Sequence, residues 1–125
     1  MSWQDYIDKS LIGSKYIDKA AIFAADGSSV WASSPGFVIE PSKEMPEIIK
    51  ALKEDSGITS LVIQGEKYII VNTEGSLRLK KGREGLVIAK TNQALLIAHH
   101  PDTVQLPNAT ATVENLADYL KGQGY

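Results

Sequence analysis

The composition of this 125-residue chain is that of an ordinary globular protein, with 43% hydrophobic and 22% charged residues, which argues against a disordered or fibrous protein. The absence of cysteine excludes disulfide bridges and thiolate metal sites. A net charge of −2 argues against a nucleic-acid-binding protein with a generally basic surface. No segment has the roughly 18 consecutive apolar residues of a membrane span. Since the first residues also lack signal-peptide character, we expect one cytoplasmic domain over residues 1–125.

The first half of the chain predicts a helix, a β-hairpin and a second helix. Apolar residues recur over 3–12 at the spacing of one helical face, with Ser2 as the expected N-cap and Gly13 as the expected end. Asp26-Gly27 separates two short apolar runs, and glycine favours a hairpin turn there because it accepts positive φ. The next helix is expected to start at 44–46 and to reach residue 55.

The second half predicts an antiparallel meander and a last helix. The expected strands are residues 61–64, 68–71, 77–80, 86–89 and 95–98, and the expected turns include Gly65-Glu66, Glu74-Gly75, Gly82 to Gly85 and Thr91 to Gln93. Connections this short join only antiparallel neighbours. An apolar stripe of period 3.6 then predicts a helix between Pro107-Asn108 and Gly122. The fold class is α+β, with one antiparallel sheet covered by helices.

The titratable residues give little support to catalysis. His99 and His100 are adjacent at a strand end, so their side chains point to opposite faces and cannot bind one metal ion together. We expect them to be a partly exposed loop pair before Pro101. The glycines of residues 82–85 lie between strands rather than at the start of a helix, unlike those of a phosphate-binding loop. Neither an enzyme nor a bound cofactor is expected.

Aromatic residues are concentrated near the two ends of the chain. Trp3 and Tyr6 are three apart on one helix and are therefore neighbours, Tyr119 lies at the margin of the last helix's apolar stripe, and Tyr125 is the final residue. Trp31, in the early hairpin, is expected to face away from its strand neighbours. If the terminal helices pack side by side, these rings form a shallow strip that can stack on prolines in a polyproline II ligand. The alternative is that the rings are core or helix-packing residues.

The densest positive run is Arg78, Lys80, Lys81 and Arg83. In a mildly acidic chain, such a local patch can steer association with an acidic partner. The alternative is a solvated hairpin edge whose lysines discourage pairing with other strands.

Many short stretches, taken in order, make the chain resemble the profilins, small proteins that bind actin monomers. The matching stretches are Ser2-Trp3-Gln4 with Tyr6 and Asp8, Leu11-Ile12-Gly13, Asp26-Gly27 with Val30-Trp31-Ala32, Ser34-Pro35-Gly36-Phe37, Gly65-Glu66-Lys67-Tyr68, Lys80-Lys81-Gly82, Lys90-Thr91-Asn92-Gln93-Ala94-Leu95 and Leu116-Ala117-Asp118-Tyr119-Leu120. The resemblance covers essentially the whole chain. It implies a central antiparallel sheet of six to seven strands, with the N- and C-terminal helices on one face and shorter helices on the other.

The resemblance also implies three sets of binding residues. The positions that match the profilin site for proline-rich segments are Trp3, Tyr6, Trp31, Tyr119, Leu120 and Tyr125. The positions that match the separate actin-binding face are Lys67, Arg78, Lys80, Lys81, Lys90, Val104, Gln105 and Asn115. The candidates for binding phosphoinositide headgroups are Lys80, Lys81 and Arg83.

The function that the resemblance implies is an adaptor for monomeric actin and proline-rich partners such as formin-type assembly factors. It would regulate actin polymerisation in the cytoplasm, in association with the cytoskeleton. The alternative is a peripheral phosphoinositide-binding regulator with weak actin binding. Two segments depart from the pattern of many profilins, Leu77-Arg78-Leu79 in place of a Tyr-Gly pair and Leu106 to Ala109 in place of Pro-Gly. Both lie near the presumed actin face, so they bear on actin affinity.

Overall fold

The structure is a computed structural model, and it describes residues 2–27, 29–34, 37, 45–52, 57–72 and 76–125. Within these residues the strands form one seven-stranded antiparallel sheet of order β2-β1-β7-β6-β5-β4-β3. The strands are β1 (Lys19–Ala24), β2 (Val30–Ser33), β3 (Ser60–Ile63), β4 (Glu66–Asn72), β5 (Leu77–Lys81), β6 (Glu84–Lys90) and β7 (Ala94–His100). The predicted α+β class and the antiparallel meander are confirmed.

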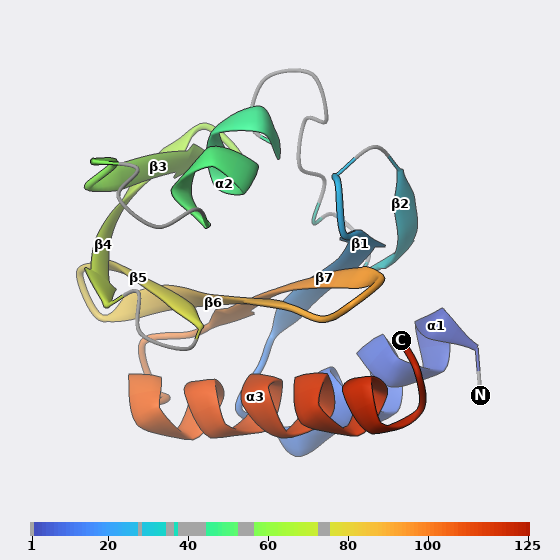
Figure 1. Cartoon of the computed structure of the whole chain (residues 1–125). Helices are drawn as coiled ribbons and strands as arrows, with labels where there is room; N and C mark the ends of the chain where they lie inside the picture. Colours follow the sequence, from blue (N-terminus) through green and yellow to red (C-terminus); the bar gives the residue numbers. More distant parts are fainter. Residues whose placement is uncertain (1, 28, 35–36, 38–44, 53–56, 73–75) are drawn as a thin grey trace.

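Helices cover both faces of the sheet. The N-terminal helical segment consists of α1 (Trp3–Asp5), the π-helical turn η1 (Tyr6–Leu11) and the 3₁₀ turn η2 (Ile12–Ser14). This segment and α3 (Leu106–Gly122) lie side by side on one face, whereas α2 (Met45–Ala51) lies on the other (Figure 1). The predicted placement of the two terminal helices on one face is confirmed. No helix of the described segments is both long and apolar enough to cross a membrane.

The N-terminal segment begins as predicted but ends later. The Ser2 hydroxyl accepts a hydrogen bond from the Asp5 N–H at 3.2 Å, and the Asp5 carboxylate accepts one from the Ser2 N–H at 3.2 Å, which completes a capping box. The hydrogen bond from the backbone N–H of Ser2 is the main reason that the pKa of Asp5 is lowered. The predicted stop at Gly13 is wrong, because the 3₁₀ turn includes Gly13 and the segment ends at Lys15, whose φ is 69°.

The sheet separates two hydrophobic cores. Ile22 and Leu96 face the first core, under the terminal helices, whereas Phe23 and Leu95 face the second core with α2. Successive residues of a strand point to opposite faces, so the central strands are buried on both sides. This double burial explains their nearly continuous apolar sequences.

Several predicted boundaries shift. The last helix begins at Leu106, before the expected Pro107-Asn108, because proline is tolerated in the first helical turn. Gly85 lies in β6 rather than in the turn, where a Cβ atom would stand 2.6 Å from both His100 Nε2 and the Leu79 carbonyl. The expected turn Glu74-Gly75 and the end of the second helix at 53–55 lie outside the described residues.

The expected exposure of the histidine pair is wrong. His99 and His100 complete β7 and are only 2% and 1% exposed. His99 Nδ1 lies 2.6 Å from an Asp18 oxygen and its Nε2 lies 3.1 Å from a Glu84 oxygen. These acids come from before β1 and from the start of β6, so contacts between strands bury a pair that the local sequence places in a loop.

Candidate functional site

Five aromatic residues form one continuous surface, here called the aromatic strip, at the end of the molecule where the two chain termini lie. Its members are Trp3, Tyr6, Trp31, Tyr119 and Tyr125. The Trp3 ring centroid lies 4.7 Å from that of Trp31, 5.2 Å from that of Tyr125 and 5.6 Å from that of Tyr6. The ring centroids of Tyr6 and Tyr119 lie 6.3 Å apart. These distances are those of rings in mutual contact.

The strip is only partly open to solvent. Tyr119 is 51% and Tyr125 40% exposed, whereas Tyr6 is buried at 8%. Burial, and next the neighbouring Tyr119, raise the pKa of the Tyr6 phenol above its ordinary value. Leu120 is fully buried beneath the strip, which makes it a support for the rings rather than an exposed contact.

Trp31 reaches the strip through a β-bulge. Pairing places Ile22 opposite Ala32 and Phe23 opposite Val30, so Trp31 is the extra residue of β2. Strict alternation predicts that Trp31 faces away from Ala32, and this prediction is wrong. Both side chains pack against the first core, because the bulge turns the indole toward Trp3.

Hydrogen bonds to the backbone of Tyr125 fix the position of its ring. The Thr91 hydroxyl donates to the main-chain oxygen of Tyr125 at 2.8 Å, and the Gln93 N–H donates to the same oxygen. The Tyr125 N–H in turn donates to the Leu120 carbonyl at 2.9 Å. We call these three contacts the tail clamp. Thr91 and Gln93 lie in the turn between β6 and β7, so the sheet fixes the last ring of the strip.

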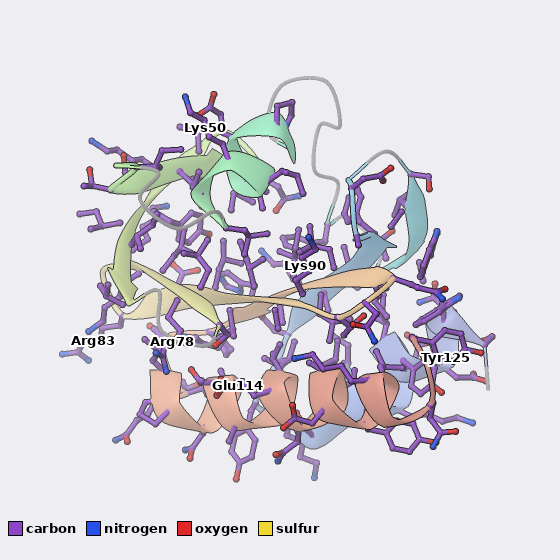
Figure 2. All side chains as sticks on the ribbon, in the orientation of Figure 1. Lys50, Arg78, Arg83, Lys90, Glu114 and Tyr125 are labelled. Atoms are coloured by element: carbon purple, nitrogen blue, oxygen red, sulfur yellow. The ribbon has the colours of Figure 1, made fainter. Side chains whose placement is uncertain are left out.

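A second candidate surface lies at the opposite end of the sheet. α3 packs against β6 and β7, and beyond it the same side of β3, β4 and β5 is open. We call this region the uncovered face, and its residues are Val62, Lys67, Ile69, Val71, Arg78 and Lys80. Figure 2 shows Arg78 and Arg83 at this end and Tyr125 at the other, beside the N-terminal segment. The two candidate surfaces are therefore separate.

The uncovered face contains apolar residues that sequence reasoning missed. Val62, Ile69 and Val71 are 50%, 57% and 50% exposed. Tyr68 and Ile70 of the same strand point into or against the second core. The sequence feature that could have revealed them is the run Tyr68 to Val71. This run is apolar at every position, although one side of β4 faces solvent.

The structure does not bring all of the predicted basic residues together. Lys80 is exposed on the uncovered face, whereas Lys81 points to the opposite side of β5, where its Nζ lies 2.8 Å from a Glu66 oxygen. The hydrogen bond from Lys81 is the first cause that lowers the pKa of Glu66. Lys80 and Lys81 therefore do not belong to one patch, and Arg83 is an exposed residue of the adjoining turn.

The other positions predicted for the actin face lie within α3, just before it, or beside it at the end of β6. Val104 and Gln105 precede the helix, and Lys90 and Asn115 line a hollow of about 400 Å³ beside it. A second hollow of about 360 Å³ joins the uncovered face to the start of α3 and contains Arg78. Figure 2 shows Glu114, which lines both hollows, on the side of α3 that faces the sheet.

The two departures from the profilin pattern have structural roles. Leu77 and Leu79 are buried in the second core, and only Arg78 between them reaches the uncovered face. Leu106 packs against the first core and Ala109 is fully buried in it. These leucines and Ala109 are therefore explained by core packing.

Comparisons with known proteins agree over the whole chain. The family model Profilin matches residues 1–125. The chain is 42% identical over 128 aligned positions to Profilin of Saccharomyces cerevisiae, with all of both chains covered. A crystal structure of Schizosaccharomyces pombe profilin superimposes with a TM-score of 0.93 at 37% identity, covering 99% of this chain and 100% of that one. LokiProfilin2, solved in a complex with rabbit actin, superimposes with a TM-score of 0.80 at 27% identity, covering 98% of each chain.

Proposed function

The chain belongs to the profilin family, and we propose that it is a single-domain, non-enzymatic adaptor that binds monomeric actin and proline-rich assembly factors. It regulates actin polymerisation by holding monomers on the uncovered face while the aromatic strip binds a proline-rich segment, such as one from a formin-type factor. The cytoplasm, in association with the cytoskeleton, is the location that this function requires. LokiProfilin2, which is similar over nearly its full length, was solved with rabbit actin.

The observation that carries the proposal is the contact of Trp3 with Trp31, Tyr6 and Tyr125 in one partly exposed strip. A polyproline II ligand is already ordered and has exposed carbonyls, and prolines have no N–H to donate. Flat rings offer stacking surfaces, while indole N–H and phenol O–H groups offer the donors that such carbonyls need. Because the rings support one another before binding, little ordering cost is added.

The uncovered face has the composition of a protein interface. Exposed Val62, Ile69 and Val71 provide apolar area, and Lys67 and Lys80 lie beside them. Apolar contacts at the centre of an interface with charges at its rim are typical of protein complexes. Actin is an acidic protein, so these lysines favour encounter by electrostatic attraction. Since this face and the strip lie at opposite ends, both partners can be bound at once.

Peripheral phosphoinositide binding remains a secondary proposal. Lys80 and Arg83 are exposed cations near the β5–β6 turn. Lys81, however, is engaged with Glu66 on the other side of the strand. This separation favours the actin adaptor over a dedicated membrane-binding protein.

The direct test is titration with a proline-only peptide while intrinsic tryptophan fluorescence is recorded. The chain has two tryptophans, and both lie in the aromatic strip, so the signal reports on that site alone. We expect a saturable change, together with slower spontaneous polymerisation when the protein is added to actin monomers. Absence of the fluorescence change at saturating peptide would contradict the proline-rich site, and unaltered polymerisation would contradict the actin function.

A further inference from the structure

A cluster of charged residues surrounds one buried histidine where β1 and β6 begin and β7 ends. His99 is 2% exposed, and each of its ring nitrogens faces a carboxylate. Nδ1 lies 2.6 Å from an Asp18 oxygen, and Nε2 lies 3.1 Å from a Glu84 oxygen. Asp18 precedes β1, and its N–H donates to the His99 carbonyl at 3.0 Å, whereas Glu84 begins β6. The imidazole of β7 therefore joins the two strands that flank it in the sheet.

These two contacts determine which protons the ring must carry. A carboxylate can only accept hydrogen bonds, whereas a neutral imidazole has one N–H donor and one acceptor nitrogen. A neutral His99 would therefore direct a lone pair at either Asp18 or Glu84. Only the doubly protonated imidazolium donates to both, and such charge-assisted hydrogen bonds are stronger than those between neutral groups.

The surrounding charges balance a positive ring. Lys19 of β1 lies opposite His99, and Lys81 of β5 pairs with Glu66 of β4 at 2.8 Å. Lys81 is the main cause that lowers the pKa of Glu66, and Lys19 and His99 act in the same direction. The described members of the cluster are three acids, Asp18, Glu66 and Glu84, and three bases, Lys19, Lys81 and His99. With a neutral ring, one carboxylate would have no matching cation.

The two aromatic neighbours of His99 add no charge. The Tyr68 ring stands edge-on to the His99 ring, with centroids 6.5 Å apart, and burial, followed by the nearby acids, raises the pKa of Tyr68 to about 12. The His100 ring is also 6.5 Å away, and its Nδ1 lies 2.9 Å from the Pro101 carbonyl. Among the described residues, Nε2 of His100 has no hydrogen-bond partner. One ring proton is therefore enough for His100, whereas His99 needs two.

We propose that His99 is an imidazolium that links β1, β6 and β7 as a pH-sensitive latch, and that loss of its proton above neutral pH weakens this link. A histidine in the unfolded chain has an ordinary pKa of about 6.5 and is largely neutral above that pH. The folded chain then binds one proton more than the unfolded chain. The contribution of the latch is therefore complete below about pH 6.5, and it falls as the pH rises.

The first test measures the protonation state of each histidine. The chain contains two histidines, so ¹⁵N labelling of histidine gives two ring systems whose nitrogen shifts distinguish an imidazolium from a neutral ring. At about pH 7 we expect one cationic ring and one neutral ring. Glu84→Gln keeps an acceptor oxygen beside Nε2 but removes its charge. Because Glu84 is partly exposed, this variant should bind the His99 proton about threefold more weakly. Asp8→Asn, at an exposed acid outside the cluster, should not alter either ring.

The second test measures urea unfolding of the same proteins between about pH 6.5 and 8.5. The unfolding equilibrium constant of the wild type should rise with pH by up to about tenfold per unit, whereas that of His99→Gln should stay level because glutamine binds no proton. If His99→Gln does not fold, Glu84→Gln replaces it, and its stability should begin to fall at a lower pH than that of the wild type. The latch is overturned if both histidines are neutral at about pH 7, or if the wild-type profile matches that of the comparison variant.

Discussion

The aromatic strip and the uncovered face are built in different ways. Around Trp3, rings contact one another, and the tail clamp fixes Tyr125 through backbone atoms. On the uncovered face, Ile69 and Lys80 lie opposite each other on neighbouring strands, but they are an aliphatic and a basic side chain and form no ring-to-ring contact like those of the strip. We therefore expect the strip to act as a cooperative unit and the uncovered face to act as a sum of weaker contacts. Substitution of one residue should therefore weaken ligand binding at the aromatic strip far more than at the uncovered face.

The largest effect is expected from Trp3→Ala. The substitution removes the ring that contacts Tyr6, Trp31 and Tyr125. Truncation of a central aromatic residue lowers the free energy of binding by about 2 kcal/mol or more, which is a loss of roughly 30-fold in affinity. Calorimetry with a proline-only peptide measures this loss of affinity. Tyr16→Ala is the control, since Tyr16 is 43% exposed and lies outside the strip. Retained peptide affinity in Trp3→Ala would show that the rings do not act as a unit.

A smaller effect, on actin alone, is expected from Ile69→Asp. The side chain is 57% exposed, so the fold tolerates the change, but a carboxylate on this face opposes an acidic partner. We expect about a tenfold loss of affinity for monomeric actin, with peptide binding unchanged. The matched control is Val30→Asp, because Val30 is 53% exposed on the edge strand at the far end of the sheet. Equal effects of the two substitutions would argue that the uncovered face is not the actin site.

The tail clamp is tested by Thr91→Val, which removes the hydroxyl that donates to Tyr125. We expect peptide affinity to fall about fivefold, as for one lost hydrogen bond, and Thr91→Ser to restore it. Because the Thr91 hydroxyl also bonds to Ala94 in its own turn, a double-mutant cycle with Tyr125→Ala is needed. Additive losses in that cycle would mean that Thr91 acts through the turn and not through the ring.

The smallest effect is expected from Lys80→Glu. Charges at the rim of an interface mainly change the association rate, so actin association should slow about threefold at low salt and recover as salt is added. Lys81→Glu should change this rate less, because Lys81 points to the other side of β5 and pairs with Glu66. Stopped-flow measurements at two salt concentrations compare the variants. A stronger effect of Lys81→Glu would contradict the separation of the two lysines.

Local sequence patterns predicted those structural features that depend on residues close together in the sequence. The Ser2 cap, the hairpin around Asp26-Gly27 and the antiparallel meander each follow from a few adjacent positions. The resemblance also identified the five ring positions that the structure brings into contact. The separation of Lys80 from Lys81 was readable from strand alternation as well, but grouping the cations by sequence proximity concealed it.

The remaining features depend on contacts between distant segments. Trp31 joins the strip because pairing with β1 leaves it as the bulged residue. His99 is buried where Asp18, just before β1, and Glu84, at the start of β6, contact its ring. The π-helical turn was also hidden, since Tyr6, Ile7 and Leu11 fit an ordinary helical spacing.

The tail clamp has a practical consequence for how the molecule is labelled. The Tyr125 oxygen is occupied by Thr91 and Gln93, and its ring lies against Trp3 near the other end of the chain. A fluorophore or affinity tag attached after Tyr125 or ahead of Ser2 would thus stand beside the aromatic strip and compete with its ligand. The exposed tip of the β1–β2 hairpin at Asp26 lies on neither the aromatic strip nor the uncovered face. A reporter inserted there leaves both binding surfaces intact.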